Sequence, residues 1–397
     1  MSNLTPVSLK LLLPLLASIV ALSPFAIDLY LPAMPIIAND LNTEFSLVQN
    51  TLSIYLLGYA LGLILAGPLA DKYSRRFMVF FGITGFLLAT LLLPFCENIT
   101  QFLAVRFVQA FVSSAAIVVV PGTVREIYGA NTAKGLSYVS MIMMLAPMIA
   151  PTIGSVLMFI MDWKLIFWAL AFYSFVILMF AVKYLPEKEK VSNKSTQSFL
   201  ARYIVVLSNA EARLDLLSSM MISLAFFGYI TGIAYVYMQV FGVSEFNFSL
   251  LFGLTVVALM TSHFTNTRLV VKKGSRKMQG YGLVLAITSA SLLVLVTVLE
   301  LPLFYTVVSI LPLMASFSMI AVNTDALVLT KFPEQSGTVT AVIGTLRFGI
   351  GAFAGPILSY FNNGTALPFV LLMFVSVLIV VGCQTKVRIG LNKELST

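Results

Sequence analysis

The sequence predicts an all-α integral membrane protein that crosses the bilayer about twelve times. Hydrophobic residues make up 59% of the 397 residues and charged residues only 10%, and the mean hydropathy is +0.98. Soluble domains usually carry about 25% charged residues, and a globule of this size leaves a large area facing water. The apolar residues are gathered in runs of roughly 20 or more, the length that a helix needs to cross a bilayer. Lipid is therefore the expected solvent for most of the chain.

The apolar runs are long enough to favour helices over membrane β-strands, which would be about 9–11 residues long and alternate in polarity. The first run, which begins near Leu11, could belong to a signal peptide. It continues to Leu31 without a small-x-small cleavage site, so we interpret it as the first span. The predicted spans are residues 10–31, 47–70, 77–96, 99–123, 136–160, 164–184, 214–240, 247–270, 278–299, 302–329, 337–360 and 367–385.

The charges predict the orientation. If both termini are cytoplasmic, all basic residues lie in inside loops or at inside helix ends, except Lys164, Arg106 and Arg347. The outside loops instead carry acidic residues, namely Asp40, Glu44, Glu97, Asp162, Glu245 and Glu300. This bias follows the positive-inside rule. It also accounts for the net charge of +8 without a nucleic-acid partner.

The longest polar stretch, residues 186–213, divides the chain into two halves of six spans, residues 1–185 and 214–397. We interpret this stretch as a cytoplasmic linker, with a short helix on the membrane surface near Tyr203 to Leu207.

Short sequence matches relate the two halves. The loop from Lys72 to Arg76 matches that from Lys273 to Lys277, and Ala150-Pro151 matches Gly355-Pro356, each about half the chain apart. Two related bundles around a midplane site are the architecture of many secondary transporters. The matches therefore predict two pseudo-symmetric six-helix bundles.

The loop after the second span begins in Gly67-Pro68-Leu69-Ala70-Asp71 and continues as Lys72-Tyr73-Ser74-Arg75-Arg76. Small residues let helices approach closely, and an acidic side chain can face a basic partner or a helix N-terminus. The segment resembles the loop pattern G-x-L-a-D-r-x-G-r-k-x of the major facilitator superfamily, with Ser74 at a glycine position. The resemblance implies the major facilitator fold and a conformational gate made of Gly67, Asp71, Arg75 and Arg76. An ordinary basic loop is the alternative.

The fifth span contains Ala146-Pro147 and Ala150-Pro151-Thr152-Ile153-Gly154-Ser155. Two prolines four residues apart free backbone carbonyls and bend a helix. The segment resembles the antiporter motif g-x-x-x-G-P-x-x-G-G of the drug:H⁺ antiporters, in the form that has alanine before proline. The resemblance implies an exporter in which Pro147, Pro151 and Gly154 shape this helix.

The first span ends in Asp28-Leu29-Tyr30-Leu31-Pro32-Ala33-Met34-Pro35. This D-x-Y-L-P-A-x-P segment resembles the Bcr/CflA subgroup of drug exporters. An ionisable residue inside a span is costly and suggests function, and a low-dielectric cavity favours the neutral form of a carboxyl group. We therefore expect Asp28 to carry the coupled proton. The alternative is a solvated residue at the helix end.

Arg106, in the fourth span, lies in a segment that resembles the superfamily pattern R-x-x-q-G, with Gln109 and Ala110 at its end. The first and fourth spans both line the cavity in this fold. The resemblance therefore implies that Arg106 lies near Asp28 and responds to its protonation, or is a static partner.

A second arginine, Arg347, is expected near mid-membrane in the eleventh span. It could contact polar substrates or pair with Asp325. Asp215, at the inner start of the seventh span, is interpreted as a solvated end residue. Aromatic and methionine side chains with a few polar groups suit a cavity for varied drugs. The predicted cavity residues are Tyr30, Gln109, Met144, Phe227, Tyr235, Met238 and Arg347.

Together these features predict a monomeric transporter in a bacterial inner membrane that exchanges protons for lipophilic drugs, such as chloramphenicol-like or bicyclomycin-like compounds. The proton gradient is the expected driving force and no cofactor is expected. The sequence shows no phosphate-binding loop, metal-ligand cluster or nucleophile–base pair that would indicate an enzyme. A dedicated exporter of a polar metabolite, such as a siderophore or a sugar, is the main alternative. A sensor or a lipid scramblase is less well supported, because no signalling domain is visible and Asp28 suggests coupling.

Overall fold

The computed structural model describes residues 6–128, 132–185, 199–332 and 336–394, although some side chains within these ranges lie outside the description. Every regular element in these ranges is helical. Eleven described helices are long and apolar enough to cross a membrane, and a shorter apolar helix covers Leu145–Ile160. This shorter helix falls within the predicted fifth span. An all-helical membrane fold is confirmed, whereas the count of twelve spans and the side on which the termini lie stay predictions.

The chain forms two compact units. Unit 1 comprises Met1–Lys194 and Glu245–Gly253, and unit 2 comprises Ser195–Ser244 and Leu254–Thr397. The predicted halves differ from these units at Glu245–Gly253, which begins the predicted eighth span but packs with the first unit.

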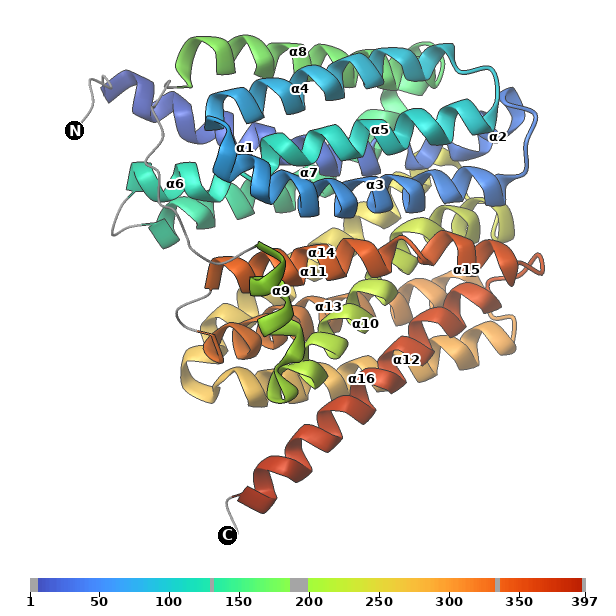
Figure 1. Ribbon diagram of the computed structural model, residues 1–397. Coiled ribbons are helices and arrows are strands. Elements are labelled where there is room, and N and C mark those ends of the chain that lie inside the picture. The colour runs from blue at the N-terminus through green and yellow to red at the C-terminus, as the bar shows by residue number, and fades with distance from the viewer. Residues whose placement is uncertain (1–5, 129–131, 186–198, 333–335, 395–397) are drawn as a thin grey trace. The chain divides into compact units, whose positions relative to one another are not determined.

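In unit 1, α3 packs on α5, α5 on α4, α4 on α8 and α1 on α7, and these long helices run along one another (Figure 1). Hydrogen-bonding side chains begin two of them: Ser74 accepts from the Phe77 amide before α4, and Asn98 accepts from the Gln101 amide before α5. The helices are α1 (Pro6–Asp28), α2 (Met34–Asp40), α3 (Phe45–Lys72), α4 (Arg75–Leu92), α5 (Ile99–Ile117), α6 (Val120–Tyr128), α7 (Thr132–Ile160) and α8 (Lys164–Tyr184).

The first span is interrupted in its second half. Helix α1 ends at Asp28, a single 3₁₀ turn covers Leu31–Ala33, and α2 begins at Met34. Pro32 and Pro35 are each the second residue of the two new helical segments. Proline lacks an amide hydrogen and disfavours the α-conformation in the residue before it. The prolines therefore end α1 at Asp28 and place its carboxylate at a break in a membrane helix.

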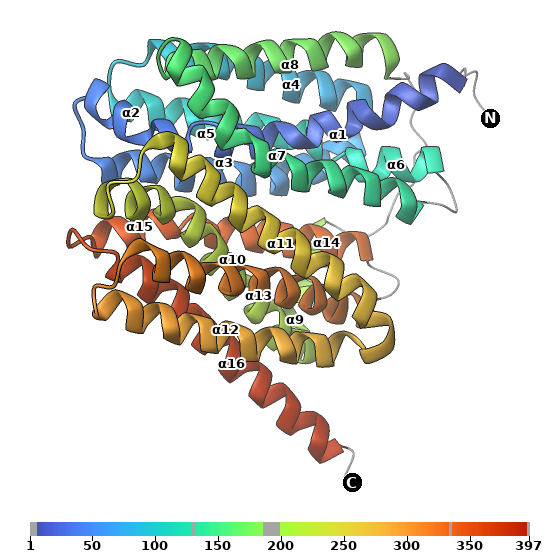
Figure 2. The ribbon, with the colours of Figure 1, turned by 180° about the vertical axis from the view of Figure 1, so that it is seen from behind.

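In unit 2, α12 packs on α13 and α16, and α10 packs on α13, α14 and α16. The C-terminal part of α16 extends away from the other helices of this unit (Figures 1 and 2). The helices are α9 (Phe199–Ser208), α10 (Ala210–Ala234), the π-helical η4 (Tyr235–Val240), α11 (Glu245–Lys273, whose start belongs to unit 1), α12 (Ser275–Val298), α13 (Leu303–Thr330), α14 (Ser336–Gly351), α15 (Ala354–Tyr360) and α16 (Leu367–Glu394).

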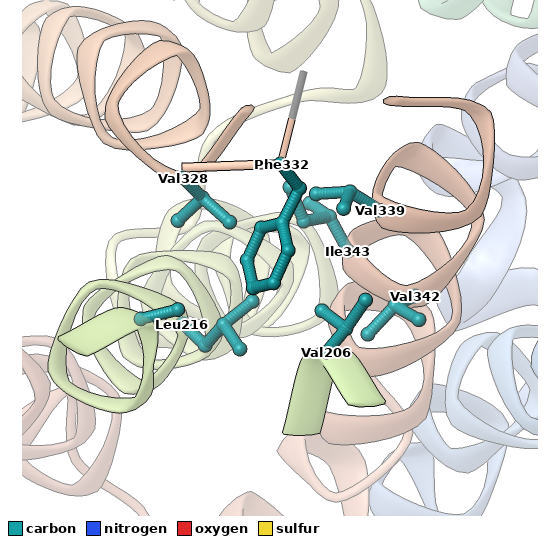
Figure 3. Packing of buried hydrophobic residues seen from close by; sticks show 8 residues of the cluster. Val206, Leu216, Val328, Phe332, Val339, Val342 and Ile343 are labelled. Atoms are coloured by element: carbon teal, nitrogen blue, oxygen red, sulfur yellow. The ribbon is translucent and has the colours of Figure 1, made fainter. Parts of the chain in front are cut away.

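Part of the predicted linker is the short helix α9, which contacts α10 and α14. Val206 of α9 is fully buried in an apolar cluster with side chains from α10, α13 and α14, among them Leu216, Val328 and Val342 (Figure 3). Ile204 and Val205 of α9 are exposed. The helix predicted near Tyr203 to Leu207 is therefore present and packed on unit 2. Its place on the membrane surface stays a prediction.

Candidate functional site

The centre of unit 1 holds a fully buried arginine between two tyrosine rings. The guanidinium carbon of Arg106, on α5, lies 4.5 Å from the ring centroid of Tyr30 and 4.6 Å from that of Tyr55, on α3. All three side chains have an exposed fraction of 0%. The faces of aromatic rings attract cations, and more strongly where water is excluded. The two rings therefore stabilise this charge in place of water.

Hydrogen bonds fix the guanidinium on two further sides. Nη1 of Arg106 donates to Oε1 of Gln109 at 2.8 Å, and Nη2 donates to the carbonyl oxygen of Ala26 at 3.0 Å. Nε2 of Gln109 donates to the hydroxyl of Thr90 at 2.7 Å, and that hydroxyl donates to the carbonyl oxygen of Phe86 at 2.6 Å. Arg106 is therefore linked to α1 directly and to α4 through Gln109.

The tyrosines of this cluster are also fixed through their hydroxyl groups. Tyr30 shares a hydrogen bond of 2.8 Å with Thr51, and Tyr55 donates to Ser23 at 3.2 Å. Each of these bonds joins the first span to α3, and both hydroxyl partners are buried. The cluster therefore has a defined geometry.

Asp28 is buried beside this cluster and is not neutralised by it. Its exposed fraction is 3%, and its Oδ1 atom has no hydrogen-bond partner among the described residues. Nε of Arg106 is likewise buried without a hydrogen-bond partner among the described residues. Arg106 binds the carbonyl of Ala26, two residues before Asp28, yet the two side chains form no ion pair in the described structure. The two predicted coupling residues thus belong to one region but are not bonded to each other.

The predicted antiporter segment of α7 packs against the backbone of Leu29, the residue after Asp28. A Cβ atom added to Gly154 of α7 would overlap the carbonyl oxygen of Leu29. Only glycine therefore allows this approach of α7 to the break in the first span. At the neighbouring turn, Ser249 of α11 donates to the carbonyl oxygen of Pro151 at 2.9 Å and lies 2.7 Å from the hydroxyl of Ser155. Pro147 lies inside α7, one turn earlier.

The predicted gate residues lie at the connection between α3 and α4. Arg75 forms an ion pair of 2.7 Å with Glu126 of α6. Arg76 donates to the carbonyl oxygen of Val182 at 3.1 Å. Gly67 lies in the last two turns of α3, whereas the side chain of Asp71, like that of the predicted cavity residue Met144, lies outside the described part of the structure. The described contacts join α4 to α6 and α8.

Unit 2 contains a second intramembrane arginine with a different environment. Nη2 of Arg347, on α14, forms an ion pair of 2.7 Å with Asp325 of α13, and its Nε donates to the hydroxyl of Ser219 of α10 at 3.2 Å. That hydroxyl donates in turn to Asp325 at 3.1 Å. The side chains of Arg347 and Asp325 are 27% and 22% exposed. Of the two roles predicted for Arg347, pairing with Asp325 is therefore present.

The interpretation of Asp215 as a solvated end residue was wrong. Its exposed fraction is 0%, and it accepts from Arg276 and from Lys331, each at 3.2 Å. Gln384 of α16 also donates to it, at 2.9 Å. The position near a helix end suggested that water solvates the carboxylate, but Arg276 of α12, Lys331 directly after α13 and Gln384 of α16 each donate to it. Such long-range partners have no signal in the local sequence.

The seventh-span aromatic residues split into buried and partly exposed groups. Phe227 is buried, with its ring centroid 5.5 Å from that of Phe348. Tyr235 and Met238 are partly exposed and lie in the π-helical segment η4. π-Helical turns often occur at functional sites. In unit 1, the predicted cavity residues Tyr30 and Gln109 are instead enclosed around Arg106. The sequence analysis missed Tyr55, Thr90 and Ser219, because single hydroxyl groups in an apolar run carry no distinctive pattern.

A family model described as Major Facilitator Superfamily matches residues 16–356. The chain belongs to this superfamily. It is 28% identical over 362 residues to a "Bicyclomycin resistance protein homolog" of Haemophilus influenzae, and the alignment covers 90% of this chain and 91% of that protein. It is 29% identical over 396 residues to a "Chloramphenicol resistance protein" of Pseudomonas aeruginosa, covering 94% and 92%.

The chain has the same fold as solved structures of other transporters. A crystal structure of the D-xylose-proton symporter aligns with a TM-score of 0.72 at 14% identity, over 94% of this chain and 96% of that chain. The predicted resemblance to major facilitator drug exporters is confirmed by the family model and by the relatives' names. This facilitator is therefore a multi-pass membrane transporter and not an enzyme.

Proposed function

We propose that this facilitator exports small lipophilic drugs, such as chloramphenicol-like or bicyclomycin-like compounds, in exchange for protons across a bacterial inner membrane. The observation that carries the proposal is the buried carboxylate of Asp28, which has no ion-pair partner in the described structure and an oxygen atom free of hydrogen bonds. An ionisable group held in this way inside a membrane helix is a functional group by default. The names of the relatives support drugs as substrates.

In the proposed cycle, Asp28 takes up a proton when the site is open to the outside and releases it when the site is open to the cytoplasm. Arg106, held by the tyrosines and Gln109, binds the carbonyl oxygen of Ala26, two residues before Asp28. Because Arg106 is not bound to Asp28, proton binding to Asp28 need not break an ion pair. Twelve spans, cytoplasmic termini and a monomeric working unit belong to the same proposal, and the proton gradient is its driving force without a cofactor.

The test uses proteoliposomes with an imposed pH gradient. Addition of chloramphenicol to wild type is expected to collapse the gradient, and Asp28→Asn is expected to abolish this drug-dependent proton flux. Glu97→Gln is the matched control, because Glu97 is an exposed acid in the connection before α5 and should leave the flux unchanged. Drug movement by wild type without proton flux would contradict the coupling. Retained coupling in Asp28→Asn would assign the proton to another group.

Export of one dedicated polar metabolite is the second candidate. It is favoured by the partly exposed pair of Arg347 and Asp325, since charges that reach a binding site suit a polar ligand. Drug-susceptibility profiles of cells that express the protein distinguish the two candidates. Resistance to several unrelated drugs supports the broad exporter, and resistance to none supports the dedicated one.

A further inference from the structure

Arg347 and Asp325 form an ion pair between two membrane helices in which both side chains are partly exposed, whereas Asp215, which pairs with Arg276 and Lys331, is fully buried. Asp325 is five residues before the end of α13, and Arg347 lies in the last two turns of α14. The pair between Arg75 and Glu126 lies at helix ends, and both of its members are about two-fifths exposed. A charged pair in a span faces protein or a water-filled space and not lipid. The exposed side of Arg347 and Asp325 therefore faces water or a ligand.

The hydrogen bonds of this cluster leave donor capacity on the exposed side. Nε of Arg347 donates to the hydroxyl of Ser219, and Nη2 donates to the carboxylate of Asp325. These bonds do not use Nη1, so this amino group remains for a ligand that carries an acceptor. A guanidinium offers five N–H donors in a fixed plane. The carboxylate of Asp325 offers acceptor sites beyond those occupied by Ser219 and Arg347.

The backbone of α14 leaves room one turn before Arg347. Gly344 precedes Arg347 by three residues, so both lie on one face of the helix. Side chains on a helix lean towards its N-terminus, which brings the stem of Arg347 over the turn that contains Gly344. A Cβ atom added to Gly344 would meet no atom within 4 Å. A polar cluster and an open position thus lie one turn apart on α14.

We propose that Arg347, Asp325, Ser219 and the open face at Gly344 form a subsite that binds an uncharged hydrogen-bonding group of the substrate, namely an amide or a hydroxyl. The inference rests on the proposed export function and adds the polar group that this unit recognises. One guanidinium and one carboxylate neutralise each other, so a charged ligand would have to compete with a bond that already exists. An amide or a hydroxyl can accept from Nη1 and donate to Asp325 while the pair stays intact.

The experiment fills the open volume without touching the charges. Gly344→Leu adds a side chain whose Cβ meets no atom within 4 Å, and leucine favours a helix more than glycine does. Gly382→Leu is the matched control, because Gly382 of α16 also has no atom within 4 Å of an added Cβ. Ser219→Ala is the second variant, since it removes the hydroxyl that links the pair. The probes are chloramphenicol, which carries an amide and hydroxyl groups, and tetraphenylphosphonium, which carries no hydrogen-bonding group.

Equilibrium binding to purified protein in nanodiscs is the readout. Gly344→Leu and Ser219→Ala are expected to weaken chloramphenicol binding by about tenfold or more, the size of one hydrogen bond to a charged group. Both should leave tetraphenylphosphonium binding and thermal stability near wild type, and Gly382→Leu should change neither probe. Unchanged chloramphenicol binding in both variants would overturn the subsite.

Two further outcomes separate the subsite from the export function. If wild type binds tetraphenylphosphonium but not chloramphenicol, the subsite is overturned while drug export stands. If wild type binds both probes and drives no proton exchange with either, the proton coupling fails. In that case, the difference between Gly344→Leu and Gly382→Leu still decides the subsite.

Discussion

Units 1 and 2 each hold one arginine inside a membrane helix, and they stabilise it in different ways. Arg106 is fully enclosed and has two tyrosine faces, an amide oxygen and a backbone carbonyl as partners. Arg347 is paired with Asp325 and keeps about a quarter of its side chain exposed. The first arrangement keeps a positive charge in place without neutralising it. The second neutralises the charge but leaves its hydrogen bonds within reach of a ligand.

This difference suggests separate tasks for the two units. A buried charge without a counter-ion costs several kcal/mol of desolvation, so stability alone does not explain Arg106. Its hydrogen bond to the carbonyl oxygen of Ala26, two residues before Asp28, is consistent with the proposed coupling role. A neutral, partly exposed pair carries no net charge that would act on a proton but can select the polar part of a substrate. Unit 1 is thus suited to the proton and unit 2 to the ligand.

Replacement of the two arginines by leucine gives the largest expected contrast. Arg106→Leu should reduce drug-dependent proton flux in proteoliposomes to the level of protein-free vesicles. It should change the free energy of unfolding by no more than about 1 kcal/mol, because the lost contacts are offset by the removal of a buried charge. Arg347→Leu should keep coupled flux with tetraphenylphosphonium and weaken chloramphenicol transport.

Unfolding in mixed detergent micelles provides the stability measurement for both variants. Arg106→Lys is the control, because lysine keeps the charge but not the planar group that fits between two rings. If Arg106→Leu retains coupled flux, the division of tasks between the units is wrong. The same conclusion follows if Arg347→Leu loses coupling with both drugs.

The close approach at Gly154 predicts the next largest effect. Gly154→Ala should destabilise unit 1 by about 1–3 kcal/mol, because the added methyl group overlaps the backbone at Leu29 and must push α7 away. Gly382→Ala should be neutral or slightly stabilising, since its Cβ meets no neighbour. Since Leu29 follows Asp28, coupled flux should fall together with stability in the first variant. A wild-type unfolding midpoint for Gly154→Ala would show that α7 does not hold the first span in this position.

The sequence predicted the fold well because membrane helices and their order leave a strong composition and charge signal. Asp28, Arg106, Gly154 and Arg347 were singled out as candidates from motifs or from the rarity of charges in apolar runs. Their partners were less predictable. Tyr55 and Ser219 come from other helices, and nothing in their local sequence distinguishes them from lipid-facing or packing residues. Asp215 was misjudged for the same reason, since its burial depends on three distant helices.

The smallest expected effect concerns the contact between the ring of Tyr55 and the guanidinium of Arg106. Tyr55→Phe keeps the ring beside Arg106 and loses the hydrogen bonds of the hydroxyl group, among them the one to Ser23, so it should cost about 0.6 kcal/mol for each bond, the average for such bonds in membranes. Tyr55→Leu removes the aromatic face as well and should cost about 1–2 kcal/mol more. The measurement is unfolding in mixed micelles, with proton flux at several pH values. The flux of Tyr55→Phe should keep the wild-type pH profile, whereas that of Tyr55→Leu should shift, because a loosened Arg106 no longer acts on Asp28 from a fixed position. Equal effects of the two substitutions would show that packing volume, and not the cation–π contact, holds Arg106, and the charge would then need a partner other than the two rings.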